Sequence, residues 1–198
     1  MIARSLPALA YALGAAASVD EAFLRLADAL TESDRDTVLA LLRVDPRTGL
    51  IRERARAVNG RIEREAMETS VEQLPAAVHR TVTEGGSFAE VQEDQAAYAR
   101  LLRVPEPEAG GQLLLLGVRH ERQLIAIIAA VEPKRVFGTR VTERLGPLAA
   151  LFELAVARFV EQESRAEAVR TLEAVTQRVH QDYLQRLAEL EARIERQT

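Results

Sequence analysis

The sequence predicts an α+β protein in which helices cover both faces of a β-sheet and a long helix follows at the C-terminus. Two apolar runs, QLLLLGV (112–118) and QLIAIIAAV (123–131), have the length of strands and do not alternate with polar residues. Strands of that kind are covered on both faces. A third observation is the segment after Pro133, where residues 142–197 keep helical spacing almost without interruption.

Composition is that of an ordinary globular protein, with 198 residues, 47% apolar and 28% charged. The net charge of -4 gives no electrostatic reason to bind nucleic acid or an anionic membrane. No stretch approaches the roughly 20 apolar residues of a membrane span. We therefore expect a cytoplasmic protein with neither nucleic acid nor membrane as a partner.

Two helices are expected before the first strand. Residues 1–17 resemble a signal peptide weakly, but their leucines fall at helical spacing, which favours a short amphipathic helix. Ser18 then precedes VDEAFLRLADAL, and Glu21 lies three residues after it. This spacing is typical of a capping box and predicts a helix from residue 19.

A β-hairpin is expected next. TVLALLRV (37–44) and LIRERARAV (50–58) flank DPRTG, which has the residues of a tight turn. Strict alternation in the second strand would place its arginines on one face of the sheet. The opposite face would then carry Ile51, Glu53, Ala55 and Ala57.

Residues 59–104 have the least regular pattern. EREAMET (63–69) predicts a short helix, and VEQLPAAVHRTVTEGG (71–86) predicts a helix that ends at its glycine pair. SFAEVQ (87–92) has the length of one strand. DQAAYARLLRV (94–104) predicts a further helical turn or two before Pro105.

The C-terminal helix carries an apolar seam with coiled-coil spacing and one extra four-residue step. A single helix of this length leaves such a seam exposed, so we expect a homodimer through the terminal helices and the coiled coil. The predicted dimer interface comprises Leu148, Phe152, Ala155, Phe159, Val169, Leu172, Val179, Tyr183, Leu187, Leu190 and Ile194.

Chemical motifs are scarce. The chain has no cysteine, which excludes disulfides, thiolate metal sites and cysteine nucleophiles. His79, His120 and His180 lack metal-ligand spacing, and no P-loop, G-x-G-x-x-G, G-x-S-x-G or H-E-x-x-H pattern occurs. We expect no catalytic residue, no metal and no cofactor.

The arginine-rich strand and His180 each allow a functional interpretation as well as a purely structural one. The arginines of residues 51–65 could bind nucleic acid, but no aromatic residue accompanies them and glutamates dilute their charge, which favours a solvated strand face. His180 could accept a phosphoryl group, but Gln181 follows it and no Arg-x-Pro-Leu pattern lies downstream. We interpret His180 as the flank of a coiled coil.

Residues 18–160 resemble the GAF domain family of small-molecule-sensing and dimerising modules. LLLLGVRHERQLIAIIAAV (113–131) is similar to the family's paired central strands, and VFGTRVTERLGPLAALFELAVARFV (136–160) to the segment that follows them. The resemblance implies a sheet of five or six antiparallel strands, with the terminal helices on one face. Residues 59–107 would form a roof over the other face, and residues 161–198 a coiled-coil extension.

In GAF domains that bind a ligand, the ligand sits under this roof. The resemblance therefore implies candidate ligand-binding residues among the polar side chains of the roof: His79, Arg80, Glu90, Gln92, Tyr98 and Arg103. Each could equally be a solvated or capping residue. Bilin attachment and free methionine sulfoxide reduction, two activities found in the family, are excluded because both need a cysteine.

Two functions remain open at this point. One is a non-enzymatic dimeric sensor, in which a small-molecule ligand or a protein partner biases a coiled-coil output helix. The alternative is a degenerate GAF fold that acts purely as a structural scaffold or adaptor for another protein. A scaffold would fill the space under the roof with its own side chains: Leu74, Val78, Val82, Leu101 and Leu102.

Overall fold

The computed structural model describes residues 6–31, 36–58, 60–84, 88–137 and 139–195. The chain divides into two compact units, Met1–Arg158 and Phe159–Thr198. The boundary between them falls inside the last helix, so each unit is described by itself.

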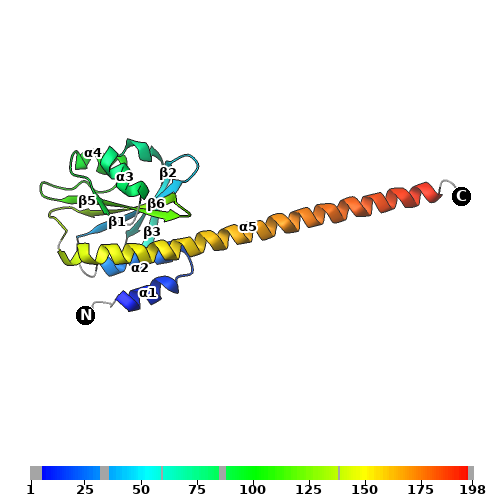
Figure 1. The fold of residues 1–198 in the computed structure, drawn as a ribbon, viewed down its shortest axis with the longest axis horizontal. Helices are drawn as coiled ribbons and strands as arrows, with labels where there is room; N and C mark the ends of the chain where they lie inside the picture. Colours follow the sequence, from blue (N-terminus) through cyan, green and yellow to red (C-terminus); the bar gives the residue numbers. More distant parts are fainter. Residues whose placement is uncertain (1–5, 32–35, 59, 85–87, 138, 196–198) are drawn as a thin grey trace. The chain divides into compact units, whose positions relative to one another are not determined.

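The first unit contains a six-stranded, wholly antiparallel sheet with the strand order β3-β2-β1-β6-β5-β4 (Figure 1). This confirms the α+β class and the predicted antiparallel sheet. The strands are β1 (Val38–Asp45), β2 (Leu50–Val58), β3 (Arg61–Ser70), β4 (Phe88–Glu90), β5 (Gln112–His120) and β6 (Gln123–Glu132).

Helices cover both faces of this sheet (Figure 1). On one face lie α2 and the part of α5 that belongs to the first unit, whereas α3 and α4 cover the other face. The helices are α1 (Leu6–Gly14), α2 (Val19–Thr31), the 3₁₀ turn η1 (Val71–Gln73), α3 (Ala76–Glu84), α4 (Gln95–Leu101) and α5 (Thr139–Glu195).

The two apolar runs form the central hairpin β5–β6, as the sequence predicts. Leu113 and Leu115 of β5 face the α3–α4 side, where they join the main hydrophobic cluster. Leu114 and Leu116 are also buried, and by the alternation of a strand they face the opposite side. The absence of polar alternation therefore reflects burial on both faces.

The segment EREAMET is a strand and not the predicted helix. It lies within β3, which pairs with β2 through partners such as Arg54 with Glu65. Glu, Ala and Met favour helices intrinsically, but hairpin pairing overrides that preference. The signal for the hairpin was Asn59-Gly60, the dipeptide preferred in two-residue hairpin turns, and Gly60 has a φ of 72°.

The expected strict alternation along β2 is also wrong. The register shifts in this part of the hairpin, where Val44 pairs with Ile51 but Arg43 pairs with Glu53. Ile51 consequently joins the cluster under α3 and α4. Ala55 pairs with Leu41, which lies on the other face. A β-bulge of this kind moves a side chain from one face of a sheet to the other.

Five hydrogen bonds fix the helices on the α2 side. The Glu21 backbone N–H donates to the Ser18 hydroxyl at 3.2 Å, while the Glu21 carboxylate accepts from the Ala17 N–H at 2.7 Å, which completes the predicted capping box. Arg25 of α2 donates to the Ala12 carbonyl of α1 at 2.6 Å. Arg158 of α5 donates to the carbonyl oxygen of Gly14, the last residue of α1, and to that of Ala16 just after it.

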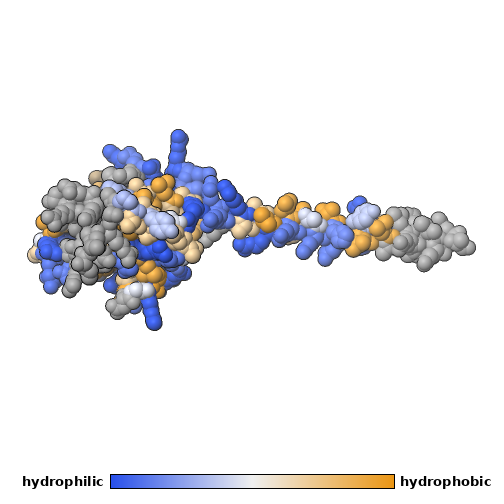
Figure 2. All heavy atoms as spheres, turned by 90° about the horizontal axis from the view of Figure 1, so that it is seen from below, coloured by the Kyte–Doolittle hydropathy of each residue, from blue (hydrophilic) through white to orange (hydrophobic). Residues whose placement is uncertain are grey.

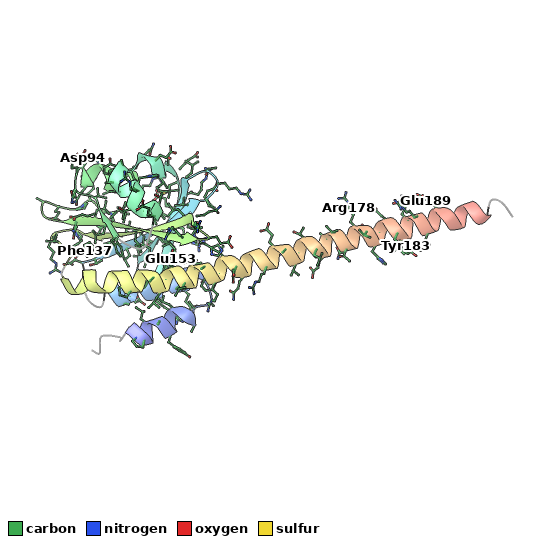
Figure 3. The ribbon with its side chains drawn as sticks, in the orientation of Figure 1. Asp94, Phe137, Glu153, Arg178, Tyr183 and Glu189 are labelled. Atoms are coloured by element: carbon green, nitrogen blue, oxygen red, sulfur yellow. The ribbon has the colours of Figure 1, made fainter. Side chains whose placement is uncertain are left out.

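The first part of α5 is joined to α2 by an aromatic pair and to the sheet by a hydrogen bond. Phe152 packs edge-to-face on Phe23 of α2, with ring centroids 6.3 Å apart. The Glu153 carboxylate accepts a 3.0 Å hydrogen bond from the Arg119 backbone N–H, at the register shift of the β5–β6 hairpin. Figure 3 shows Glu153 on α5 below the sheet.

Candidate functional site

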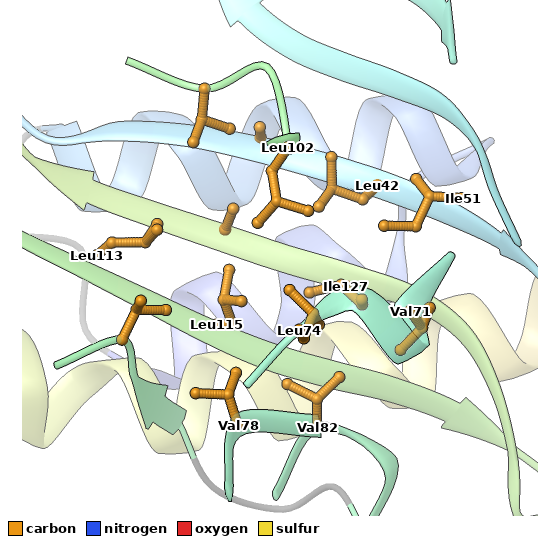
Figure 4. Packing of buried hydrophobic residues seen from close by; sticks show 14 of the residues in the cluster. Leu42, Ile51, Val71, Leu74, Val78, Val82, Leu102, Leu113, Leu115 and Ile127 are labelled. Atoms are coloured by element: carbon orange, nitrogen blue, oxygen red, sulfur yellow. The ribbon is translucent and has the colours of Figure 1, made fainter. Parts of the chain in front are cut away.

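The space between the sheet and the helices α3 and α4 is filled by the protein's own side chains. Figure 4 shows this packing from close by. The side chains of Leu74, Val78 and Val82 point from the roof toward the sheet, and Leu102 points toward it from the end of α4. They meet sheet residues that are equally buried: Leu42, Ile51, Leu113, Leu115 and Ile127.

Gly117 explains how closely α3 approaches the sheet. This glycine lies in the middle of the apolar run of β5, and the backbone carbonyl of Val82 occupies the place where its Cβ would stand. Helix α3 therefore rests on β5 backbone against backbone at this point. A ligand between them would have to displace the helix.

The roof begins later in the sequence than predicted. Residues 61–70 belong to the sheet as β3, so the covering segment starts at Val71. Four of the five residues expected in a filled interior are buried there, namely Leu74, Val78, Val82 and Leu102. Leu101 is partly exposed.

The six predicted ligand residues do not converge on one enclosed site. Arg80, Glu90, Gln92 and Arg103 are exposed, and His79 is half-buried on α3. Tyr98 of α4 packs against the hydrophobic cluster. Only Glu90 and Gln92 line a common cleft.

Arg103 has structural partners in place of a ligand. Its guanidinium donates to the Glu65 carboxylate at 2.5 Å and to the Ala66 carbonyl at 3.1 Å. Arg54 donates to the Arg103 carbonyl at 2.5 Å and to the same Glu65 carboxylate at 2.7 Å. These contacts join the C-terminal end of α4 to the β2–β3 hairpin.

An open cleft of about 450 Å³ lies between α3 and the edge strand β4. Its apolar lining comes from Pro75, Ala77, Val78, Phe88 and Ala89, and its polar lining from Thr81, Glu90, Gln92 and Glu93. The Thr81 hydroxyl donates to the Ala77 carbonyl within α3. Among the lining residues that the structure describes, two carry negative charge and none carries positive charge.

Sequence reasoning identified half of the polar lining of this cleft and missed Thr81 and Glu93. Both follow from helix and strand geometry only once α3 is known to lie beside β4. A signal was nevertheless present, because two carboxylates lie at the end of the short strand and just after it, in AEVQE (89–93).

The second unit carries an exposed apolar stripe on α5. Its large apolar side chains are between 38% and 68% exposed. The surface of a monomeric soluble protein rarely exposes so many large apolar side chains in one continuous row. Figure 2 shows hydrophobic residues recurring along this part of the helix, and Figure 3 shows Tyr183 and Arg178 on different sides of it. The stripe comprises Val169, Leu172, Val175, Val179, Tyr183, Leu184 and Leu187.

The other residues of the predicted dimer interface stand apart from this stripe. Phe152 and Ala155 are buried within the first unit, and Phe159, the first residue of the second unit, is 7% exposed, so none of the three belongs to the exposed stripe. The side chains of Leu148, Leu190 and Ile194 lie outside the described part of the structure. The predicted interface residues on the described surface are therefore those from Val169 to Leu187.

Neither a cluster of metal ligands nor a membrane-spanning helix occurs among the described residues. In that part of the chain no three His, Asp or Glu side chains come together in a way that could hold a metal ion. None of the helices described there is long and apolar enough to cross a membrane.

The sequence matches no family model and no curated protein. Its fold is similar to that of solved structures. The GAF domain of a phosphoenolpyruvate-protein phosphotransferase from Coxiella burnetii aligns with a TM-score of 0.57 at 10% identity, over 80% of this chain and 94% of that one. The corresponding Acinetobacter domain gives 0.52 at 11% identity, over 77% and 90%.

An enzyme has a similar fold. The free methionine-R-sulfoxide reductase from Neisseria meningitidis, solved in complex with its substrate, aligns with a TM-score of 0.51 at 12% identity, over 78% of this chain and 89% of that one. At these identities the likeness concerns the fold and not the chemistry.

Proposed function

We propose that this chain, which has the GAF fold, is a non-enzymatic regulatory scaffold of the cytoplasm that dimerises through α5 and acts through a protein partner. The resemblance seen in the sequence is confirmed at the level of the fold. GAF domains generally serve as regulatory modules, which supports the regulatory part of the proposal.

The apolar stripe of α5 is the observation that carries the proposal. An isolated helix is marginally stable in water, and one that exposes a row of Leu, Val and Tyr side chains gains stability by burying them. The simplest partner of matching length and pattern is the same helix of a second copy. Such a pair would connect two GAF folds through one coiled coil.

The filled interior favours a scaffold over a small-molecule sensor. A ligand pocket is a cavity with a few convergent polar groups. Here the corresponding space contains Leu74, Val78, Val82 and Leu102, and α3 contacts the backbone of β5 directly. Regulation through the surface of the protein needs no such space.

Dimerisation is tested by sedimentation of a double variant, Leu172→Asp with Val179→Asp. Two buried carboxylates per helix should prevent pairing, because a desolvated, unpaired charge is strongly unfavourable. The expected result is a dimer for the parent and a monomer for the variant. A parent that sediments as a monomer at every concentration would refute the proposal.

The matched control is Ala174→Asp with Gln181→Asp. These two residues have the same seven-residue spacing, and at 100° per residue they lie on the side of α5 opposite to Leu172 and Val179. Both are exposed. The control should remain dimeric, which separates loss of the seam from a general effect of negative charge on the helix.

The sensor alternative is tested by a thermal-shift screen of nucleotides, amino acids and other metabolites. A ligand at a hundred times its dissociation constant stabilises a protein by about 2.7 kcal/mol, which raises Tm measurably. The scaffold proposal expects no shift from any of them. A reproducible shift would instead favour the sensor.

A further inference from the structure

We propose that the cleft between α3 and β4 binds an extended, arginine- or lysine-bearing segment of a partner protein, which adds to the sheet as a seventh strand beside β4. The inference deepens the proposed function, because it states the chemistry of the partner that the scaffold would bind.

The first argument is the position of β4. It is the last strand in the order β3-β2-β1-β6-β5-β4, so one side of its backbone has no neighbouring strand in the described sheet. A strand in this position presents a row of N–H and C=O groups that can pair with another chain.

The pairing with β5 shows which backbone groups face outward. The Val91 N–H donates to the Leu113 carbonyl at 3.0 Å. In an antiparallel ladder the bonded residues alternate, so Ala89 is the other residue of β4 bonded to β5. The N–H and C=O groups of Phe88 and Glu90 therefore point away from β5 and remain available to an added strand.

The cleft beside β4 supplies side-chain contacts in addition to the backbone hydrogen bonds of an added strand. It borders this same edge, with an apolar wall from Ala77 and Val78 of α3 and from Pro75 before it. Side chains along a strand alternate between two sides. A segment that alternates apolar with basic residues could place its apolar side chains against this wall.

Charge determines which segment fits. Glu90 and Glu93 line the cleft, and neither carboxylate forms an ion pair with any residue that the structure describes. The described lining of the cleft contains no arginine or lysine beside them. Elsewhere in this unit carboxylates such as Glu65 and Asp20 each bind two arginines. The cleft therefore favours a cationic segment, and it disfavours an acidic one.

The test uses the full chain and a fluorescein-labelled hexapeptide that alternates valine with arginine, followed by fluorescence anisotropy. A second peptide replaces each arginine with glutamate, and a third carries N-methyl groups on the backbone nitrogens that would pair with β4. The arginine peptide should bind at least about tenfold more tightly than either of the others. Its affinity should fall as salt is added.

Two variants locate the site. Glu90→Gln combined with Glu93→Gln should weaken binding of the arginine peptide about tenfold, because it removes both carboxylates of the cleft. Glu63→Gln is the control, since Glu63 is an exposed carboxylate on β3, the opposite edge of the sheet. Binding to the control should equal binding to the parent.

Several results would overturn the proposal. These are no binding of the arginine peptide at about 1 mM, equal losses in the cleft variant and the control, or undiminished binding of the N-methylated peptide. Competition by arginine methyl ester at the same concentration as the peptide would identify a site for small cations instead. A monomeric protein that still binds the peptide would contradict the proposed dimer and leave this inference intact.

Discussion

Glu121 and Arg122 form the turn between β5 and β6 with φ angles of 49° and 69°. Two consecutive positive φ angles define the hairpin turn in which Asn-Gly is preferred, and other residues adopt that conformation at an energetic cost. Both side chains are exposed, so no packing compensates for the strain.

We expect Glu121→Asn combined with Arg122→Gly to stabilise the protein by about 1 kcal/mol, because it relieves this strain. Urea denaturation of parent and variant measures the difference. Glu121→Ala combined with Arg122→Ala is the control, since it removes the same two charges without making a positive φ easier. If the control is stabilised as much as the Asn-Gly variant, charge and not backbone strain is the cause.

Two carboxyl groups make the stability of the fold depend on pH. The Ala17 N–H, and after it the Arg25 side chain, lower the pKa of the Glu21 carboxyl below its ordinary value. Hydrogen bonds from Arg47 and Thr48 lower the pKa of Asp45 in the same direction. The folded state therefore holds these groups ionised at a pH where the unfolded chain takes up protons.

Stability contributed by Glu21 is thus complete above the ordinary carboxyl pKa of about 4 and is lost as the pH falls through the lower pKa of the folded state. Glu21→Gln should be less stable than the parent at pH 7, by a margin that shrinks toward zero as the pH falls below the lowered pKa of the folded state. Urea midpoints at a series of pH values check this. A margin that stays constant with pH would contradict it.

At the scale of elements, the contacts among Arg54, Glu65 and Arg103 hold the end of α4 on the β2–β3 hairpin. Arg103 adopts a φ of 52°, which places its guanidinium over β3 and its carbonyl within reach of Arg54. The Arg54 side chain is 13% exposed, whereas those of Glu65 and Arg103 are about half exposed, so solvent screens part of the attraction.

A double-mutant cycle of Glu65→Gln and Arg103→Gln should give a coupling energy of about 0.5–1 kcal/mol. A cycle of Glu63→Gln and Arg103→Gln should give a value near zero, because Glu63 has no contact with Arg103 among the described residues. Equal coupling in both cycles would point to long-range charge effects in place of the specific contact.

Elements with strong local signals could be predicted from the sequence. The runs of β5 and β6 have no alternation because they are buried on both faces, and the spacing of α5 and the capping box of α2 are local patterns. β3 was missed because its residues favour a helix and only pairing with β2 makes them a strand. The bulge beside Ile51 depends on register between strands, which a single strand does not encode.

The candidate site was predictable in part for the same reason. Glu90 and Gln92 could be selected as polar residues near a short strand, but their neighbours Thr81 and Pro75 come from a helix that packs beside it. The interior could not be judged empty or filled from apolar content alone. The fine fit of Val82 over Gly117 decides it, and that fit is a property of packing.

At the scale of the whole molecule, the proposed dimer links helix content to protein concentration. The unit Phe159–Thr198 exposes its stripe when unpaired, and an unpaired helix of this kind is marginal in water. Mass action therefore favours helix at high concentration.

Circular dichroism should show helical signal falling when the protein is diluted from about 100 µM to about 1 µM or lower, while the near-ultraviolet signal of the tyrosines and phenylalanines in the first unit changes little. The Leu172→Asp, Val179→Asp variant should show the lower helical signal at every concentration. Helical signal that is independent of concentration in a protein shown to be monomeric would contradict the link.

The contact of Val82 with Gly117 determines the distance between α3 and the sheet at that point. Two backbones touch there without a side chain between them, so any residue larger than glycine at position 117 acts as a wedge beneath α3. A wedge raises the helix along its length and separates Val78 from the side chains below it. Gly117→Ala should therefore displace α3 and leave a cavity beneath Val78. A single methyl group at this position would convert a filled interior into one with an internal cavity.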